Sequence, residues 1–150
     1  MSKQAEADLI LKLYDLRREP VMREARNWFF SFNPKGPDDF IDVLMGERSG
    51  HYRMVISYWD MACALVKNGA IDAELFNDAN GEHVFVYAKM EPFIPMLREQ
   101  MGAPKFLASL EKVVKDLPDC EKRLAAVRDR MAKMAALREQ RAAQAAAAGK

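Results

Sequence analysis

The sequence predicts an all-α protein, a single-domain bundle of about seven helices around a central buried helix at residues 49–68, with a long C-terminal helix. Its 150 residues are enough for one domain with a hydrophobic core, and 50% of them are hydrophobic. Apolar side chains recur along most of the chain at the spacing of a helix face. We expect the domain to span residues 1–141, followed by an alanine-rich tail, residues 142–150, that frays because it buries nothing large.

The central stretch, residues 49–68, is apolar over most of its circumference when it is placed on a helix. Such a helix is normally surrounded by others, and Trp59 lies on its more continuous apolar face. We expect Ser49 to cap the first turn and Gly69 to close the last turn in a left-handed conformation. The rest of the circumference is one narrow, mostly polar stripe, whose residues are spaced four and three positions apart. It consists of Arg53, Ser57, Asp60, Ala64 and Lys67.

Three helices are predicted before the central one, at residues 4–18, 20–32 and 37–45. Pro20 ends the first helix and suits the first position of the second, where its missing N–H costs nothing. The segment 33–36, Asn-Pro-Lys-Gly, reads as a loop.

A short helix is predicted directly after the central one. Asp72 is the expected N-cap of this helix, because its carboxylate can accept a hydrogen bond from a first-turn amide. Ile71 and Phe76 occupy the two positions of a hydrophobic staple, which fixes the direction in which the chain enters a helix.

Residues 83–91 allow two readings. Residues 83–87 are rich in strand formers and follow Asn-Gly, a hairpin signal. A hairpin needs a first strand, however, and the preceding residues do not resemble one, so we predict a helix. Pro92 and Pro95 must then interrupt it, because each removes a backbone hydrogen bond from the helix interior.

Two further helices are expected to begin at Pro104 and Pro118. The last one carries a short apolar seam flanked by alanines, which permit close approach of another helix. We expect its first half to dock on the bundle and its remainder to project, where a second copy of the chain can bind. The seam consists of Cys120, Leu124, Val127, Met131 and Met134.

Two stretches carry a family resemblance, SYWDMACALVKNGAIDAELF and EHVFVYAKMEPFIPMLREQMG. Their motifs are an aromatic-acidic pair (Trp59 and Asp60), a Leu-Val pair, Gly-x-Ile-Asp, and Pro-Phe-Ile followed by Arg98. In these motifs the sequence resembles a family of small bacterial helical proteins classed as a domain of unknown function. The resemblance covers about residues 20–117, leaves out the C-terminal helix, and implies an all-helical fold without adding chemistry.

The sequence lacks the residue patterns of an enzyme or a metal site. It contains two histidines, His51 and His83, and two cysteines, whereas zinc normally takes three or four ligands at recognisable spacing. The motifs HExxH, CxxC, GxSxG and the phosphate-binding loop are absent. Cys63 faces the apolar side of the central helix, where burial raises the pKa of a thiol. We therefore expect a non-enzymatic protein without catalytic residues, bound metal or cofactor.

Asp60 is the most conspicuous polar residue of the central helix, because no basic residue lies three or four positions away. A buried carboxylate needs a partner, and Arg98, which follows the apolar segment PFIPML, is the candidate. We expect an internal ion pair that holds two helices in register, with a cost of roughly 3 kcal/mol when either partner is lost. The alternative is a ligand pocket lined by Trp59, Asp60 and Arg98.

The C-terminal helix is basic, with seven lysines and arginines against two acidic residues between positions 122 and 141. Such a helix can lie on an anionic membrane or bind the phosphates of nucleic acid. More often it is a solvated flank, and no aromatic side chain interleaves these residues to stack on bases. The basic sector beside the apolar seam consists of Lys122, Arg123, Arg130 and Lys133.

These sequence features are compatible with three functions from different classes. The leading one is a non-enzymatic protein-interaction or structural module that self-associates as a homodimer through the C-terminal helix. The alternatives are electrostatic binding of nucleic acid or anionic membrane, and a small-ligand binder or enzyme with a pocket near Trp59 and Asp60. The N-terminal segment carries acidic residues and no signal-peptide core, and no apolar run approaches the roughly 20 residues that span a bilayer, so we expect a cytoplasmic protein.

Overall fold

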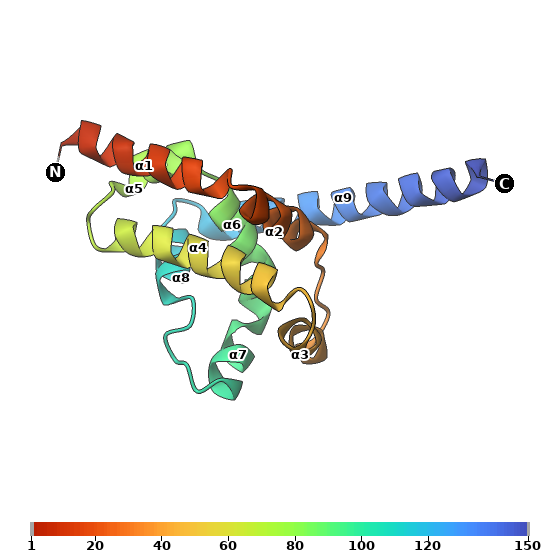
Figure 1. The fold of residues 1–150 in the computed structure, drawn as a ribbon. Helices are drawn as coiled ribbons and strands as arrows, with labels where there is room; N and C mark the ends of the chain where they lie inside the picture. The colour runs from red at the N-terminus through yellow and green to blue at the C-terminus, as the bar shows by residue number, and fades with distance from the viewer. Residues whose placement is uncertain (1, 150) are drawn as a thin grey trace.

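The computed structural model describes residues 2–149 and confirms the predicted all-α fold. Within these residues there are nine α-helices, one 3-10 turn and no β-strand (Figure 1). The helices are α1 Lys3–Arg17, α2 Pro20–Ser31, α3 Pro37–Met45, α4 Ser49–Lys67, α5 Ala73–Ala79, α6 Glu82–Met90, α7 Ile94–Gln100, α8 Ala108–Lys115 and α9 Cys120–Ala148. None of the described helices combines the length and the apolar character needed to cross a membrane.

The central helix of the bundle is α4, as predicted. It packs most extensively against α2 and α8, and α3, α5 and α6 also contact it (Figure 1). Its buried side chains are Tyr52, Val55, Ile56, Trp59, Ala62, Cys63 and Val66. Because these residues cover most of its circumference, α4 joins the other helices into one hydrophobic core.

The two ends of α4 differ in how well they were predicted. Gly69 has φ +84°, the left-handed conformation expected of it. The expected cap by Ser49 is wrong, because Ser49 is the first helical residue and Arg48 precedes it without a side-chain cap. The chain enters α4 through a backbone turn, in which the N–H of Ser49 donates to the carbonyl of Gly46 at 3.3 Å.

The segment after α4 follows the sequence prediction closely. A carboxylate oxygen of Asp72 accepts a hydrogen bond from the Leu75 amide at 3.0 Å, and Ile71 and Phe76 are both buried. Residues 82–90 form α6, so the helical reading of this ambiguous stretch is confirmed. The two prolines that follow divide the helix, giving the 3-10 turn Glu91–Phe93 and then α7.

The starts of α8 and α9 lie later than predicted. Neither Pro104 nor Pro118 opens a helix; α8 begins at Ala108 and α9 at Cys120. The residues directly before them, Leu107 and Asp119, are left-handed with φ 56° and 54°. Each of these residues is the N-cap of its helix, and its left-handed backbone cannot be part of a right-handed helix, so the helix starts only beyond it.

The longest helix, α9, has a docked half and a projecting half. Leu124 is completely buried, and Val127 and Met131 pack against the core. Beyond them the helix still contacts the bundle through Arg138, which donates to the Phe30 carbonyl at 3.4 Å, and then projects from it to end far from the N-terminus (Figure 1), which confirms the predicted division. The helix continues to Ala148, since alanine is the strongest helix former. Fraying of this tail from residue 142 stays a prediction, and Lys150 lies outside the described residues.

Arg128 fastens the docked half of α9 to the end of α6. Its guanidinium donates to the Ala88 carbonyl at 3.3 Å and to a Glu91 carboxylate oxygen at 2.6 Å. Glu91 also accepts hydrogen bonds from Tyr87 at 2.9 Å and pairs with Lys115 at 3.0 Å. Burial opposes ionisation of Glu91, but these donors outweigh it and lower its pKa. One carboxylate therefore joins the 3-10 turn, α6, α8 and α9.

Candidate functional site

Asp60 and Arg98, which the sequence analysis paired, bind different partners. Asp60 Oδ1 accepts a hydrogen bond at 2.9 Å from the backbone N–H of Leu110, in the first turn of α8. Arg98 donates through Nε to the Phe106 carbonyl at 2.9 Å and through Nη2 to Glu111 at 3.2 Å. The predicted ion pair is therefore wrong. The first amides of a helix have no partner within it, so the carboxylate of Asp60 is satisfied by the start of α8.

Trp59 lies in the core and not beside a cavity with Asp60. Its side chain is 1% exposed, and its ring centroid lies 5.7 Å from that of His83 and 6.5 Å from that of Phe76. Asp60 borders a surface hollow of about 440 Å³, together with Arg53 and residues 105–107, and Trp59 does not line it. The structure thus separates the candidate pocket residues, and ligand binding at this place stays a prediction.

His83 is a buried histidine between two aromatic rings. It is inaccessible to solvent, and its Nε2 lies 2.7 Å from Oδ1 of Asn77. Because an amide oxygen accepts, Nε2 carries the proton and Nδ1 is left as an acceptor, which has no partner among the described residues. Burial lowers the pKa of His83 to about 4, so the ring is neutral near pH 7.

The depressed pKa of His83 predicts an acid-sensitive fold. An unfolded histidine has a pKa of about 6.5, so between pH 6.5 and 4 the unfolded chain binds a proton that the folded chain rejects. His83 therefore does not lower the free energy of unfolding above pH 6.5. Between pH 6.5 and 4 it lowers this free energy by at most about 1.4 kcal/mol for each pH unit. Urea unfolding between pH 4.5 and 7.5 measures this slope. His83→Phe keeps a ring in place and should flatten it; an equal slope in this variant would contradict the assignment.

The remaining candidate chemistry is consistent with a buried, unreactive interior. Burial, followed by the charge of Asp60, raises the pKa of the Cys63 thiol to about 12, as the sequence analysis expected of a core cysteine. His51 lies 3.0 Å from an Arg48 guanidinium nitrogen, far along the chain from His83. Within residues 2–149 no three His, Cys, Asp or Glu side chains gather where they could hold a metal ion.

Glu82 forms the most buried ionic cluster, which sequence reasoning missed. Its side chain is 9% exposed, and Arg26 Nε donates to both carboxylate oxygens at 2.9 and 3.0 Å. Arg17 lies 3.5 Å from the same carboxylate, and Arg26 also donates to the Arg17 carbonyl at 3.3 Å. The cluster joins α1, α2 and α6. Because its members come from three separate helices, no helical spacing along the sequence indicates that they meet.

An apolar groove lies between the middle of α9 and the helices α2 and α6. Its volume is about 420 Å³. Phenylalanines from α2 and α6 and methionines from α9 form its apolar lining, and charged residues stand at its rim. The lining residues, here called the α9 groove, are Phe30, Asn33, Gly81, Glu82, Phe85, Arg130, Met131, Met134 and Arg138. Pockets of roughly 300–1,000 Å³ with apolar walls and few polar groups are typical of small-molecule sites.

A buried lysine lies beneath one end of the α9 groove. Lys89 Nζ donates to the carbonyls of Phe29 at 2.7 Å and Phe30 at 3.3 Å, at the C-terminal end of α2. It also lies 5.0 Å from the centre of the Phe85 ring, and Arg138 donates to the same Phe30 carbonyl at 3.4 Å. Burial, with a smaller contribution from the charge of Arg138, lowers the pKa of Lys89 to about 7. Two cationic side chains thus share one acceptor.

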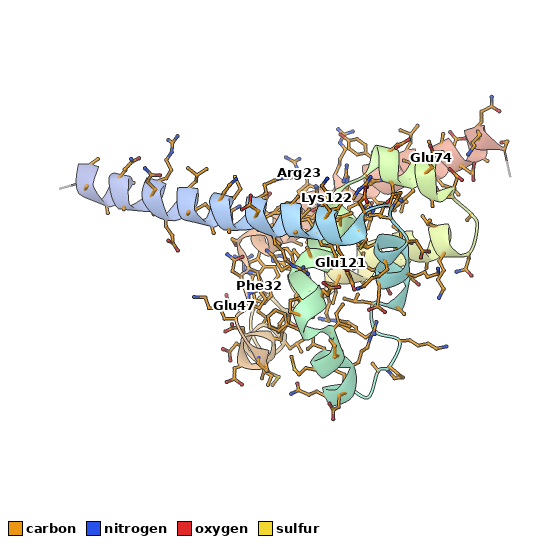
Figure 2. All side chains as sticks on the ribbon, turned by 180° about the vertical axis from the view of Figure 1, so that it is seen from behind. Arg23, Phe32, Glu47, Glu74, Glu121 and Lys122 are labelled. Carbon is orange, nitrogen blue, oxygen red and sulfur yellow. The ribbon has the colours of Figure 1, made fainter. Side chains whose placement is uncertain are left out.

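The four side chains of the predicted basic sector are exposed, but they differ in position along α9 and in the groups they contact. Lys122 lies on the docked half of α9 (Figure 2), and Arg123 follows it on the same helix. Arg130 instead lines the α9 groove. Lys133 pairs with Asp129 of the same helix at 3.0 Å. Arg138, which the sequence analysis left out of this sector, lies at the groove with Arg130. A signal was available for Arg138, since it lies four positions after Met134 and therefore occupies the next position of the apolar seam.

Comparison with known families gives one match. The family "Domain of unknown function (DUF4760)" matches residues 4–117 of this chain. The chain belongs to the DUF4760 family. No match was found among curated proteins or among solved structures. The DUF4760 region begins within α1, earlier than the predicted position 20, and leaves out α9, as the resemblance implied. The α9 groove crosses this limit, because α2 and α6 lie inside the DUF4760 region and α9 lies outside it.

Proposed function

We propose that the protein is a non-enzymatic interaction module that self-associates through the projecting half of α9. The observation that carries this proposal is an exposed apolar stripe on that half. Met134 is 46% exposed and Leu137 is 51% exposed, although both are large apolar side chains on an ordered helix. Exposed apolar side chains that continue a seam already used for packing are suited to a partner surface.

The composition of the projecting half favours another helix as the partner. Residues 142–148 are alanines except for Gln144, so two such helices can approach closely along this stretch. The docked half, held by Leu124 and Arg128, fixes the direction in which the arm leaves the bundle. A second copy offers the same stripe, and a two-fold pair of arms would bury both sets of Met134 and Leu137.

Light scattering of the full chain at micromolar concentrations tests this proposal. A dimer has twice the chain mass of 17.1 kDa. Leu137→Glu should dissociate the dimer, because it places a charge in the apolar contact. Leu11→Glu is the matched control: Leu11 is 64% exposed on α1, and its replacement should leave the dimer intact. A full-length chain that stays monomeric throughout this range, or equal dissociation by both variants, would overturn the proposal.

The second candidate function is electrostatic binding of nucleic acid or anionic membrane. It is supported by the exposure of Lys122, Arg123, Arg130 and Lys133. Such binding must weaken steeply as salt is added, because each phosphate contact releases counterions. Dimerisation through Leu137 should instead persist or strengthen with salt, so a salt titration separates the two functions.

A further inference from the structure

The α9 groove carries more positive charge than its own side chains neutralise. Two of its lining residues, Arg130 and Arg138, make no ion pair with any carboxylate in the part of the chain that the structure describes. The acidic residue at the rim, Glu82, is already engaged by Arg17 and Arg26. An apolar groove bordered by two unpaired arginines is complementary to a ligand that is apolar along its length and negatively charged at one end.

We propose that the α9 groove binds a single-chain aliphatic carboxylate, with its head group at Arg138 and its chain along Phe30, Phe85 and the two methionines. A guanidinium presents two N–H donors in the geometry of a carboxylate, which favours this head group. The groove volume of about 420 Å³ accommodates one chain and is small for a two-chain lipid. Methionine adapts its shape to an unbranched chain better than rigid side chains do.

The position of Lys89 places the head group at the Arg138 end of the groove. Lys89 and Arg138 share the Phe30 carbonyl as an acceptor, at 3.3 and 3.4 Å, and their charges repel each other. A carboxylate there relieves this repulsion. Arg130 stands at the end near Glu82 and Gly81, where a carboxylate is already present. The site is complete in one copy of the chain and does not depend on self-association.

Methyl NMR of the full chain, labelled at its methionines, tests the proposal with decanoate below its micelle concentration. The Met131 and Met134 methyl signals should shift and saturate. Met45 and Met61 are exposed elsewhere on the surface, at 85% and 44%, and serve as internal controls that should not move. Decanol, which has the same chain without the charge, should bind at least about tenfold more weakly.

Three arginine variants locate the head group. Arg138→Gln should weaken decanoate binding about tenfold, and Arg130→Gln should weaken it less. Arg141→Gln is the matched control, because it removes the same charge from α9 at a residue that does not line the groove. A thermal melt of each variant confirms that the fold is retained.

Several outcomes would overturn the proposal. These are equal binding of decanol and decanoate, equal shifts at Met45 and Met61, no loss in Arg138→Gln, or a greater loss in Arg130→Gln. Shifts that appear only with vesicles of anionic phospholipid would assign the surface to a membrane instead. Shifts of Met131 and Met134 on dilution of the protein alone, without a response to decanoate, would assign the groove to a second copy.

Discussion

Replacing Trp59 with alanine is expected to lower the free energy of unfolding by roughly 3–5 kcal/mol, out of a total of about 5–15 kcal/mol for a domain. The side chain is 1% exposed and contacts the rings of Phe76 and His83 from the centre of α4. Its removal leaves a cavity that the surrounding helices can close only in part. A thermal melt followed by circular dichroism should show a midpoint lower by roughly 10 °C, or loss of a cooperative transition.

The control for Trp59→Ala is Met61→Ala on the same helix. Met61 is 44% exposed, so its loss should change stability by no more than about 0.5 kcal/mol. Trp59→Phe should cost much less than alanine, because the indole N–H that it removes has no hydrogen-bond partner among the described residues. A melt of Trp59→Ala that resembles that of Met61→Ala would contradict the placement of Trp59 in the core.

Replacing Glu82 with glutamine is expected to cost about 3 kcal/mol, at the lower end for a broken buried ion pair. The substitution keeps the size of the side chain but leaves the guanidinium groups of Arg17 and Arg26 without a carboxylate. These arginines are 17% and 22% exposed, so water replaces the lost partner only in part. Chemical denaturation of the variant measures the loss.

Glu74→Gln is the matched control for this second prediction. Glu74 also lies in the first turn of a helix, so both substitutions remove the same favourable interaction with the helix dipole. Glu74 is exposed (Figure 2), and its replacement should cost no more than about 0.5 kcal/mol. In a double-mutant cycle, Glu82→Gln and Arg26→Gln together should cost less than the sum of the two. Additive losses would show that the cluster contributes no coupling.

The parts of the fold that the sequence predicted are those decided by neighbouring residues. The apolar circumference of α4, the Asp72 cap and the interruption after α6 each depend on residues within a few positions of one another. The partner of Asp60 could not be predicted in this way. It is a backbone amide 50 residues away, and it is available only because the left-handed Leu107 delays the start of α8.

The α9 groove escaped prediction for a related reason. Phe30, Phe85 and Met134 are apolar residues on amphipathic helices, and each one alone is typical of a core position. The direction in which α9 crosses α2 and α6 decides whether these side chains pack against one another or line an open groove. Helical periodicity states which face of a helix is apolar but does not fix the angle between two helices.

The continuity of α9 has a mechanical consequence. The helix contains no glycine or proline between Cys120 and Ala148, the usual places where a helix kinks, so it acts as one stiff lever. Its fulcrum is the contact of Leu124 and Arg128 with the bundle, and the helix extends about 30 Å from Arg128 to Ala148. A rotation of only about 5° at the fulcrum displaces the far tip by about 3 Å. A movement of Met131 and Met134 away from α6 therefore displaces the C-terminal end of α9 by a larger distance.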